Sequence, residues 1–214
     1  MQRDWVESVL KSLRSAYPGA GTRLQYNNVF ELLVAAILSA QTTDDQVNKV
    51  TKRLFKQYPT PEALAKASPE EVAEYIKSLG LYRVKSKNLV SACRVLIDKF
   101  EGKVPDTLEE LISLPGVGRK VANVVLSNAF GKDVIAVDTH VFRVANRIGL
   151  ANGRDAKETE MQLMVKLPPG TRGEAHHLLI FHGREVCRAR QPRCQDCVVS
   201  RYCKDAKKRN LDNT

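Results

Sequence analysis

An uninterrupted apolar run near the start of the chain restricts the fold more than any other feature. Residues 32–38 read Leu-Leu-Val-Ala-Ala-Ile-Leu, with no polar side chain among them. A helix that is apolar on all sides needs neighbours all round it, so we expect the segment from Val29 to about Ala40 to be the buried central helix of a bundle. The periodicity alone also allows a strand, but the alanine content and the length favour the helix.

Helix start and stop signals recur along the rest of the chain. Ser68-Pro69-Glu70-Glu71 places a cap, a first-turn proline and a capping-box glutamate in order, and Gly80 ends that helix. Thr107 with Glu110 repeats the capping box. The strand-like piece at residues 134–137 is too short and isolated for a sheet, and we interpret it as a buried connection.

Together these signals predict an all-α fold with roughly ten helices. A helix opened by Asp4 closes before Pro18, and one capped by Asp44 reaches Tyr58. The remaining amphipathic stretches span residues 84–99, 119–129, 138–147, 156–166 and 172–183.

Lysine and arginine give the chain an excess of positive charge. They number 34 against 24 acidic residues, for a formal net charge of +10. This balance is typical of proteins that bind polyanions, and DNA, RNA and anionic membrane surfaces are all compatible with it. No stretch approaches the roughly 18 apolar residues that span a bilayer, and the first residues lack the layout of a signal peptide, so we expect a cytosolic protein.

The segment Pro115-Gly116-Val117-Gly118 predicts a helix-hairpin-helix motif. It turns the chain from a short helix ending at Leu114 into a second helix that begins at Arg119. Glycines let the backbone approach another surface closely, and N–H groups at the start of the second helix can hold a DNA phosphate without reading the base sequence. Arg119 adds a positive charge there. A tight turn between packed helices would give the same pattern.

Lys120 and Asp138 are the candidate catalytic residues. Lys120 lies in the first turn after the hairpin, where the positive end of the helix and nearby cations disfavour a second positive charge. A neutral amine is a nucleophile toward the anomeric carbon of deoxyribose, although a phosphate-binding lysine is the simpler interpretation. Asp138 fits a helix N-cap, and a fixed carboxylate there can also stabilise positive charge on the sugar.

Four cysteines crowd the C-terminal region in the spacing Cys-x6-Cys-x2-Cys-x5-Cys. A loop of this length can wrap four thiolates around one inorganic centre, and the odd total of 5 cysteines fits metal ligation better than a disulfide framework. The spacing leaves zinc and an iron–sulfur cluster both open. Cys93 is distant from the others, and we expect it to be a buried structural thiol. The candidate ligands are Cys187, Cys194, Cys197 and Cys203.

Basic residues lie between and beside these cysteines. Arg188, Arg190 and Arg193 fall inside the loop, so a metal centre would hold them in place for phosphate contacts. The basic residues from Lys207 onward fit a solvated C-terminal tail.

These motifs occur in the order and spacing of the endonuclease III family, which the chain resembles over nearly its whole length. The resemblance implies two helical domains: a six-helix barrel of residues 22–132 that contains the hairpin, and a second domain of residues 1–21 and 133–214 that holds a [4Fe-4S] cluster. It implies base excision repair of double-stranded DNA carrying a damaged pyrimidine or an abasic site. In the implied reaction Lys120 displaces an oxidised pyrimidine, forms a Schiff base and cleaves the strand by β-elimination, with Asp138 as the matching carboxylate.

The resemblance also assigns residues that local patterns do not single out. Gln41 matches the position that fills the gap left by a flipped nucleotide, and Leu81 matches the one that wedges into the base stack. His140 fits the family's Asp-Thr-His, where we expect a structural hydrogen bond. The expected protein is a monomer in the cytoplasm, associated with the nucleoid and without a membrane partner. The expected DNA contacts are Gln41, Leu81, Gly116, Gly118, Arg119, His140, Arg188, Arg190 and Arg193.

Other assignments explain fewer of these features. Adenine-mismatch glycosylases share the cysteine loop but generally lack the lysine and carry a further domain. Oxidised-guanine glycosylases share the lysine and the aspartate but generally lack the cluster. A non-enzymatic helix-hairpin-helix module leaves the combination of Lys120 and Asp138 unexplained, and an iron–sulfur electron carrier explains only the cysteines.

Overall fold

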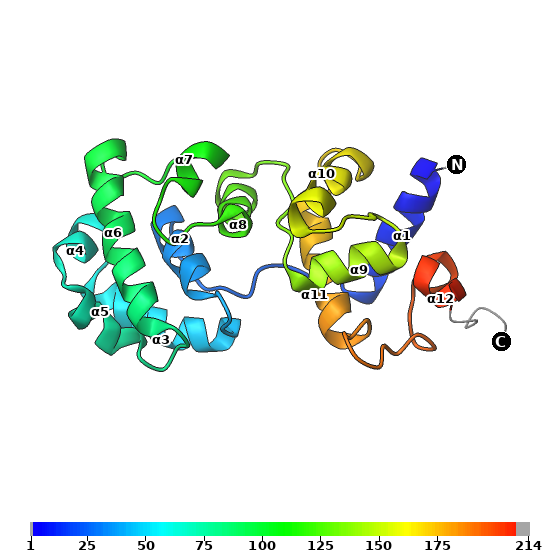
Figure 1. The fold of residues 1–214 in the computed structure, drawn as a ribbon, viewed down its shortest axis with the longest axis horizontal. Helices are drawn as coiled ribbons and strands as arrows, with labels where there is room; N and C mark the ends of the chain where they lie inside the picture. The colour runs from blue at the N-terminus through cyan, green and yellow to red at the C-terminus, as the bar shows by residue number, and fades with distance from the viewer. Residues whose placement is uncertain (1, 209–214) are drawn as a thin grey trace. The chain divides into compact units, whose positions relative to one another are not determined.

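All regular secondary structure in the described part of the chain is helical, so the all-α prediction is confirmed. The computed structural model describes residues 2–208, and the side chains from residue 4 onward. None of the described helices is both long enough and apolar enough to cross a membrane. In chain order (Figure 1) the elements are α1 (Gln2–Ala16), α2 (Val29–Leu38), α3 (Asp44–Gln57), α4 (Pro61–Lys66), α5 (Pro69–Ile76), α6 (Tyr82–Phe100), α7 (Leu108–Ile112), α8 (Arg119–Phe130), α9 (Thr139–Ile148), α10 (Ala156–Lys166), α11 (Arg172–Glu185), the 3-10 helix η1 (Ser200–Tyr202) and α12 (Lys204–Lys208).

Several helix limits differ from those predicted. Thr43 caps α3 and accepts the N–H of Gln46 at 3.4 Å, so the prediction of Asp44 as the cap is wrong and Asp44 is the first helical residue. Helix α5 ends at Ile76 and not at Gly80. The sequence did not predict α4 or α12, because helices of 6 and 5 residues are too short to show an apolar period.

The chain divides into two compact units. Residues Arg23–Gly131 form the hairpin unit, named for the predicted helix-hairpin-helix that it contains. Residues Met1–Thr22 and Lys132–Thr214 form the cysteine unit, named for the four clustered cysteines. The limits of the hairpin unit fall within one residue of the predicted limits, 22 and 132.

Helix α2 is the core of the hairpin unit, as the apolar run predicts. Asn28 caps it by accepting the N–H of Glu31 at 2.9 Å, and every residue from Phe30 to Leu38 is buried. Helices α6 and α8 pack against it on its two sides (Figure 1). Full burial of one side chain of leucine size contributes about 1.5–3 kcal/mol, so this run supplies much of the unit's stability.

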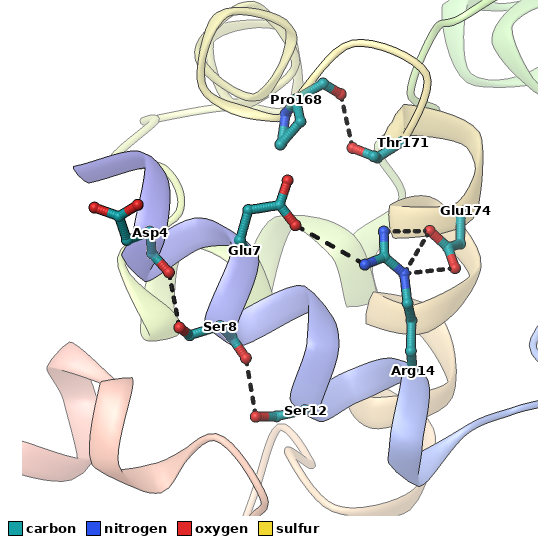
Figure 2. A network of polar contacts seen from close by, with 8 residues as sticks. All are labelled: Asp4, Glu7, Ser8, Ser12, Arg14, Pro168, Thr171 and Glu174. Carbon is teal, nitrogen blue, oxygen red and sulfur yellow. Dashed lines mark hydrogen bonds and ion pairs between the residues drawn. The ribbon is translucent and has the colours of Figure 1, made fainter. Parts of the chain in front are cut away.

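In the cysteine unit, helix α1 packs against α11, which comes from the far end of the sequence. Leu10 and Leu13 of α1 are completely buried. Above them Arg14 donates from Nε and Nη2 to the Glu174 carboxylate at 2.9 and 2.8 Å, and Glu7 lies 4.0 Å from the same guanidinium (Figure 2). These charged groups are partly exposed, so the pair contributes at most about 1 kcal/mol and the apolar contacts dominate.

The connection at residues 134–137 forms no strand, as predicted, and Ile135, Ala136 and Val137 within it are buried. His176 on α11 donates from Nδ1 to the Ala136 carbonyl at 2.7 Å. Just before the connection, the Asp133 carboxylate accepts the N–H groups of Gly170 at 2.7 Å and Arg172 at 3.2 Å and pairs with the Arg172 guanidinium. Burial raises the pKa of this carboxyl, but the bonds from Gly170 and Arg172 outweigh burial and hold the pKa below its usual range.

Helices α9 and α11 approach each other closely at Gly183. A Cβ atom added there would lie 3.1 Å from His140 Cβ and 3.1 Å from Val144 Cγ2, closer than ordinary van der Waals contact. Arg143 of α9 also donates from Nη2 to the Gly183 carbonyl at 2.9 Å. Because Gly183 has no side chain, the backbone of α11 packs directly against side chains of α9. This contact sets the position of α9 and of the residues at its start.

Candidate functional site

The hairpin lies between α7 and α8, as predicted. Leu111, Leu114 and Val117 are buried beneath it, and Val117 N–H donates to the Leu114 carbonyl at 3.0 Å to close the turn. Gly116 has a φ of +80°, and a Cβ atom on it would lie 2.9 Å from the Cβ of Asn88 on α6. Glycine at this position is therefore a requirement of the hairpin's own structure.

Gly118 occupies a different environment from Gly116. It is the N-cap of α8, with a φ of −89° that any residue can adopt, and it is exposed. An added Cβ atom would have no heavy atom of the described chain within 4 Å, apart from the chain neighbours. A requirement for glycine at this point would come from a molecule that approaches the backbone from outside, and the positive end of a 12-residue helix favours an anion.

Lys120 and Asp138 both lie at the starts of helices. Lys120 is the second residue of α8 and is half-buried, directly after the exposed Arg119. Asp138 caps α9, its Oδ1 accepting the N–H groups of His140 at 2.8 Å and Val141 at 2.7 Å, so its capping role is confirmed. The two helices belong to different units, and the catalytic roles of both residues stay predictions.

His140 makes a structural hydrogen bond, as expected. Its Nδ1 lies 3.1 Å from Nη2 of Arg143, and a guanidinium can only donate, so Nδ1 accepts and the proton of the neutral ring is on Nε2. Burial lowers the pKa of His140, and the nearby charges of Arg143 and Arg184 lower it further against the opposing effect of Asp138. These effects favour a neutral His140 imidazole beside Asp138, the cap of α9.

Gln41 and Leu81 are exposed loop residues of the hairpin unit. Gln41 has a φ of +52° and Leu81 a φ of +59°, and both side chains face solvent, with Leu81 58% exposed. A non-glycine residue adopts this left-handed conformation only where its surroundings impose it. The structure therefore holds an exposed apolar side chain in an unfavourable backbone conformation at Leu81.

The four cysteines line one cavity in the cysteine unit, between α9 and α11 and the segment that follows α11. Within residues 2–208, no three His, Cys, Asp or Glu side chains are grouped tightly enough to hold a single metal ion. Zinc needs its ligands around one ion at roughly 2.3 Å, whereas a four-iron cluster takes one thiolate at each of its irons, so its ligands are spaced further apart. Four cysteine side chains that line one cavity provide the four thiolates that an iron–sulfur cluster requires.

Burial also affects the thiols themselves. It raises the pKa of Cys197 to about 11 and raises the pKa of Cys203, so neither becomes a thiolate without a metal that binds strongly. The separate thiol of Cys93 is buried in the hairpin unit with a pKa raised by burial to about 12, which confirms it as an unreactive structural residue.

Two arginines of α9 hold the start of the cysteine loop, and the sequence did not predict either. Arg143 donates from Nε to the Cys187 carbonyl at 3.0 Å. Arg147 donates from Nη1 to the Arg188 carbonyl at 2.7 Å and from Nη2 to the Ala189 carbonyl at 3.0 Å, and Nη1 also lies 3.6 Å from Cys187 Sγ. The loop is thus fixed to α9 through its backbone.

A buried histidine contacts a second cysteine. His182 of α11 is 1% exposed, with Nε2 3.4 Å from Cys197 Sγ and Nδ1 3.1 Å from the hydroxyl of Tyr17. No sequence signal singles out these residues, because Tyr17 and His182 are 165 positions apart. The predicted phosphate-binding side chains Arg188, Arg190 and Arg193 are exposed on the same loop, and Arg193 also donates to the Glu185 carbonyl at 3.0 Å.

The structure thus brings some of the predicted site residues together. Within the hairpin unit, Gly116, Gly118, Arg119 and Lys120 lie along one turn. Within the cysteine unit, the four cysteines surround one cavity and Asp138 and His140 share the start of α9.

Known proteins similar to this chain act in DNA repair. Residues 34–169 match the family described as HhH-GPD superfamily base excision DNA repair protein. Endonuclease III of Rickettsia conorii is 47% identical over 203 residues, which cover 95% of this chain and 97% of that protein. Endonuclease III of Haemophilus influenzae is 48% identical over 195 residues, covering 91% and 92%. A solved structure of a trapped endonuclease III–DNA covalent intermediate matches with a TM-score of 0.91 at 44% identity, covering 98% of this chain and 99% of that one.

Proposed function

The chain belongs to the endonuclease III family of the HhH-GPD superfamily, and we propose that it removes oxidised pyrimidines from double-stranded DNA and cleaves the strand at the abasic site. Membership of that family makes it an enzyme of base excision DNA repair, of the DNA glycosylase and abasic-site lyase class. The oxidised pyrimidine and the residues that carry the reaction are the proposal.

Lys120 is the nucleophile in the proposed reaction. The lone pair of its Nζ attacks C1′ of the damaged nucleotide, and the bond from C1′ to the base breaks as the base leaves. Loss of a proton from Nζ and opening of the sugar ring give a Schiff base. Removal of a proton from C2′ then breaks the C3′–O bond, which cleaves the strand and leaves a phosphate on the other fragment.

Asp138 is the proposed electrostatic partner. Positive charge grows on the sugar as the base departs, and a carboxylate that is already oriented stabilises this charge without reorganising. The two backbone N–H groups that bind Asp138 Oδ1 hold the carboxylate in one orientation, and Oδ2 is the oxygen that they leave for a further role. Capping and catalysis are compatible in one side chain.

The DNA contacts in this proposal divide by what they touch. Gly118, at the exposed start of α8, approaches a phosphate without reading sequence. Gln41 and Leu81, exposed in the left-handed conformation, enter the duplex as the damaged nucleotide leaves it. The exposed arginines of the cysteine loop bind further phosphates.

One observation carries the proposal: Lys120 is the second residue of a helix whose N-cap is open to an approaching backbone phosphate. An amine in that position lies next to the sugar that the phosphate belongs to. The similarity to a protein that was captured as a covalent intermediate with DNA supports the same kind of bond here.

Borohydride trapping tests the proposed nucleophile. Borohydride reduces a Schiff base to a stable amine, so wild-type protein should form a covalent complex with an oligonucleotide containing an abasic site. Lys120→Gln should abolish the complex, while Lys157→Gln, which changes an exposed lysine on α10, should retain it. A trapped complex that persists in Lys120→Gln would contradict the assignment, and a panel of damaged pyrimidines would identify the preferred lesion.

We propose that Cys187, Cys194, Cys197 and Cys203 hold a [4Fe-4S] cluster. The cavity that all four cysteines line supports this assignment, because four thiolates are the ligand set of such a cluster. When bound, the cluster supplies structural rigidity to the loop that carries the exposed arginines. Purified protein should be brown and contain about four iron atoms per chain, and a colourless, fully active zinc protein would overturn the proposal.

The proposal extends to the setting of the reaction. The positive charge supports action on DNA in the cytoplasm, associated with the nucleoid, and a monomer suffices because one chain carries every residue that the reaction uses. Size-exclusion chromatography with light scattering would test the monomer.

A further inference from the structure

Lys85 is a buried lysine with no ion pair to a carboxylate among the described residues. The residue is 4% exposed, and burial lowers the pKa of its ammonium group. Burying a charge without a counter-charge is costly, and an apolar side chain of similar length would avoid that cost. The hydrogen bonds of the Lys85 ammonium group indicate which interactions offset the cost of burying its charge.

The ammonium group holds both ends of the turn that contains Gln41. Nζ of Lys85 donates to the Leu38 carbonyl at 2.9 Å and to the Thr42 hydroxyl oxygen at 2.9 Å. The Leu38 carbonyl belongs to the C-terminal end of α2, where a helix favours positive charge. The Thr42 hydroxyl in turn donates to the Ala40 carbonyl at 3.2 Å, so a chain of hydrogen bonds encloses Gln41 on both sides.

The backbone of the same residue holds the second exposed loop. The N–H group of Lys85 donates to the Leu81 carbonyl at 3.0 Å, which is the first hydrogen bond of α6 together with the one from Val84. Lys85 is therefore bonded to Leu38, three residues before Gln41, to the side chain of Thr42 directly after Gln41, and to Leu81 itself. Both exposed residues are in the left-handed conformation, which these bonds help to impose.

We propose that Lys85 is a positioning residue that fixes Gln41 and Leu81 as one rigid pair, so that both side chains enter the duplex together. The inference rests on the proposed function, in which these two residues take the space of the extruded nucleotide. A pair that is already ordered loses less conformational entropy on binding than two independent loops. Loosening either loop therefore slows extrusion of the base and leaves the chemistry of Lys120 intact.

Three substitutions test this role. Lys85→Met keeps a long side chain and removes the ammonium group. Thr42→Val removes the hydroxyl that links Lys85 to Ala40, and Thr42→Ser is its matched control because serine keeps that hydroxyl. Should Lys85→Met fail to fold, as judged by circular dichroism, the Thr42 pair carries the test.

The first measurement compares two substrates. Excision of an oxidised pyrimidine from a duplex requires extrusion, whereas borohydride trapping on a single-stranded abasic site does not. Lys85→Met and Thr42→Val should excise the base about tenfold more slowly, the scale of a lost hydrogen bond to a charged group. Trapping on the single strand should be unchanged, and Thr42→Ser should match wild type on both substrates.

The second measurement is independent of chemistry. With Lys120→Gln as the background, 2-aminopurine placed opposite the lesion becomes brighter when its stacking and pairing are lost. Lys85→Met and Thr42→Val should reduce that rise in fluorescence, and Thr42→Ser should not. A structural role alone would lower thermal stability without changing the fluorescence rise at a temperature where every variant is folded.

The outcomes separate this inference from the proposed function. If Lys85→Met and Thr42→Val both excise the base at the wild-type rate and show the wild-type rise in fluorescence, Lys85 has no positioning role. If these variants lose as much trapping on the single strand as excision on the duplex, the positioning role is likewise overturned. In either case a trapped complex with wild-type protein leaves the proposed function standing. Absence of any trapped complex with wild-type protein would overturn the proposed function and this inference together.

Discussion

The two hairpin glycines should respond to the same substitution in opposite ways. At Gly116, alanine must adopt a φ of +80° and its Cβ must lie 2.9 Å from Asn88 Cβ. The left-handed conformation costs an alanine about 1–2 kcal/mol, and the close contact with Asn88 adds about 1–3 kcal/mol, the cost typical of overpacking. Gly116→Ala should therefore lower the free energy of unfolding by about 2–5 kcal/mol, a large part of what a domain possesses.

At Gly118 the same change should leave the fold nearly intact. Alanine is a poorer N-cap than glycine by about 0.5–1 kcal/mol. Alanine also lowers the conformational entropy of the unfolded chain, which stabilises the folded state by about 0.4–1 kcal/mol. The net change in the free energy of unfolding therefore stays within about 1 kcal/mol. The new methyl group projects into open space, where it holds a phosphate away from the start of α8. Loss of a hydrogen bond to a charged phosphate should weaken DNA binding about tenfold or more.

Two assays separate these effects. Urea unfolding followed by circular dichroism gives the free energy of unfolding, and fluorescence anisotropy with a duplex that contains an uncleavable abasic analogue gives affinity. Gly19→Ala is the matched control, since Gly19 is exposed, has no unusual φ and has no heavy atom within 4 Å of its added Cβ. If Gly118→Ala binds DNA like wild type, the backbone of the hairpin is not the phosphate contact. If Gly116→Ala is as stable as wild type, the argument from φ and Asn88 is wrong.

Three further substitutions test other parts of the molecule. Asp133→Asn should lower the free energy of unfolding by about 1–3 kcal/mol at neutral pH; because the folded pKa lies below the usual 3.8, the difference should disappear as pH falls from 3.8 through the folded pKa. Arg147→Lys keeps the charge but loses the guanidinium group that donates to two carbonyls at once. The free energy of unfolding should therefore fall by about 1–3 kcal/mol. Charge reversal at Arg190 or Arg193 should weaken DNA binding and flatten its salt dependence without changing lesion preference.

Each of these has an outcome that would count against its reasoning. A difference between Asp133→Asn and wild type that persists in acid would mean that the carboxylate charge is not the stabilising group. An Arg147→Lys protein as stable as wild type would show that the bonds to the cysteine loop contribute little. If the salt dependence of DNA binding is unchanged after charge reversal, Arg190 and Arg193 do not contact phosphate and are ordinary solvated surface residues.

Local signals in the sequence predicted most of the helices and the hairpin. The apolar run at residues 32–38 specified a buried helix because no partly exposed arrangement could accommodate it. Asp138 was recognisable as a cap because capping depends on residues two and three positions away. The short α4 was missed although Thr60-Pro61 is a start signal of the same kind as Ser68-Pro69, because 6 residues show no period.

The residues that the sequence did not reveal owe their roles to distant partners. Lys85 lies at the start of the amphipathic stretch predicted at residues 84–99, and the sequence did not single it out. Its burial depends on α2 and the turn after it, because its hydrogen-bond partners are 47 and 43 positions away. Tyr17 and His182 meet only because α1 packs on α11. No local pattern encodes such contacts, since they follow from how whole helices pack.

The positive charge of the chain consequently has two physical uses that composition cannot separate. Lys85, Arg143 and Arg147 are turned inward, where they bind backbone carbonyls and fix loops. Arg188 and Arg190 are exposed, where counterion release on phosphate binding is available to them. Substitution of an inward-facing cation should change stability or base extrusion and leave the salt dependence of DNA binding almost unchanged. Substitution of an exposed arginine should change that salt dependence and leave stability almost unchanged. Salt dependence therefore distinguishes the cations that shape the site from those that hold the DNA.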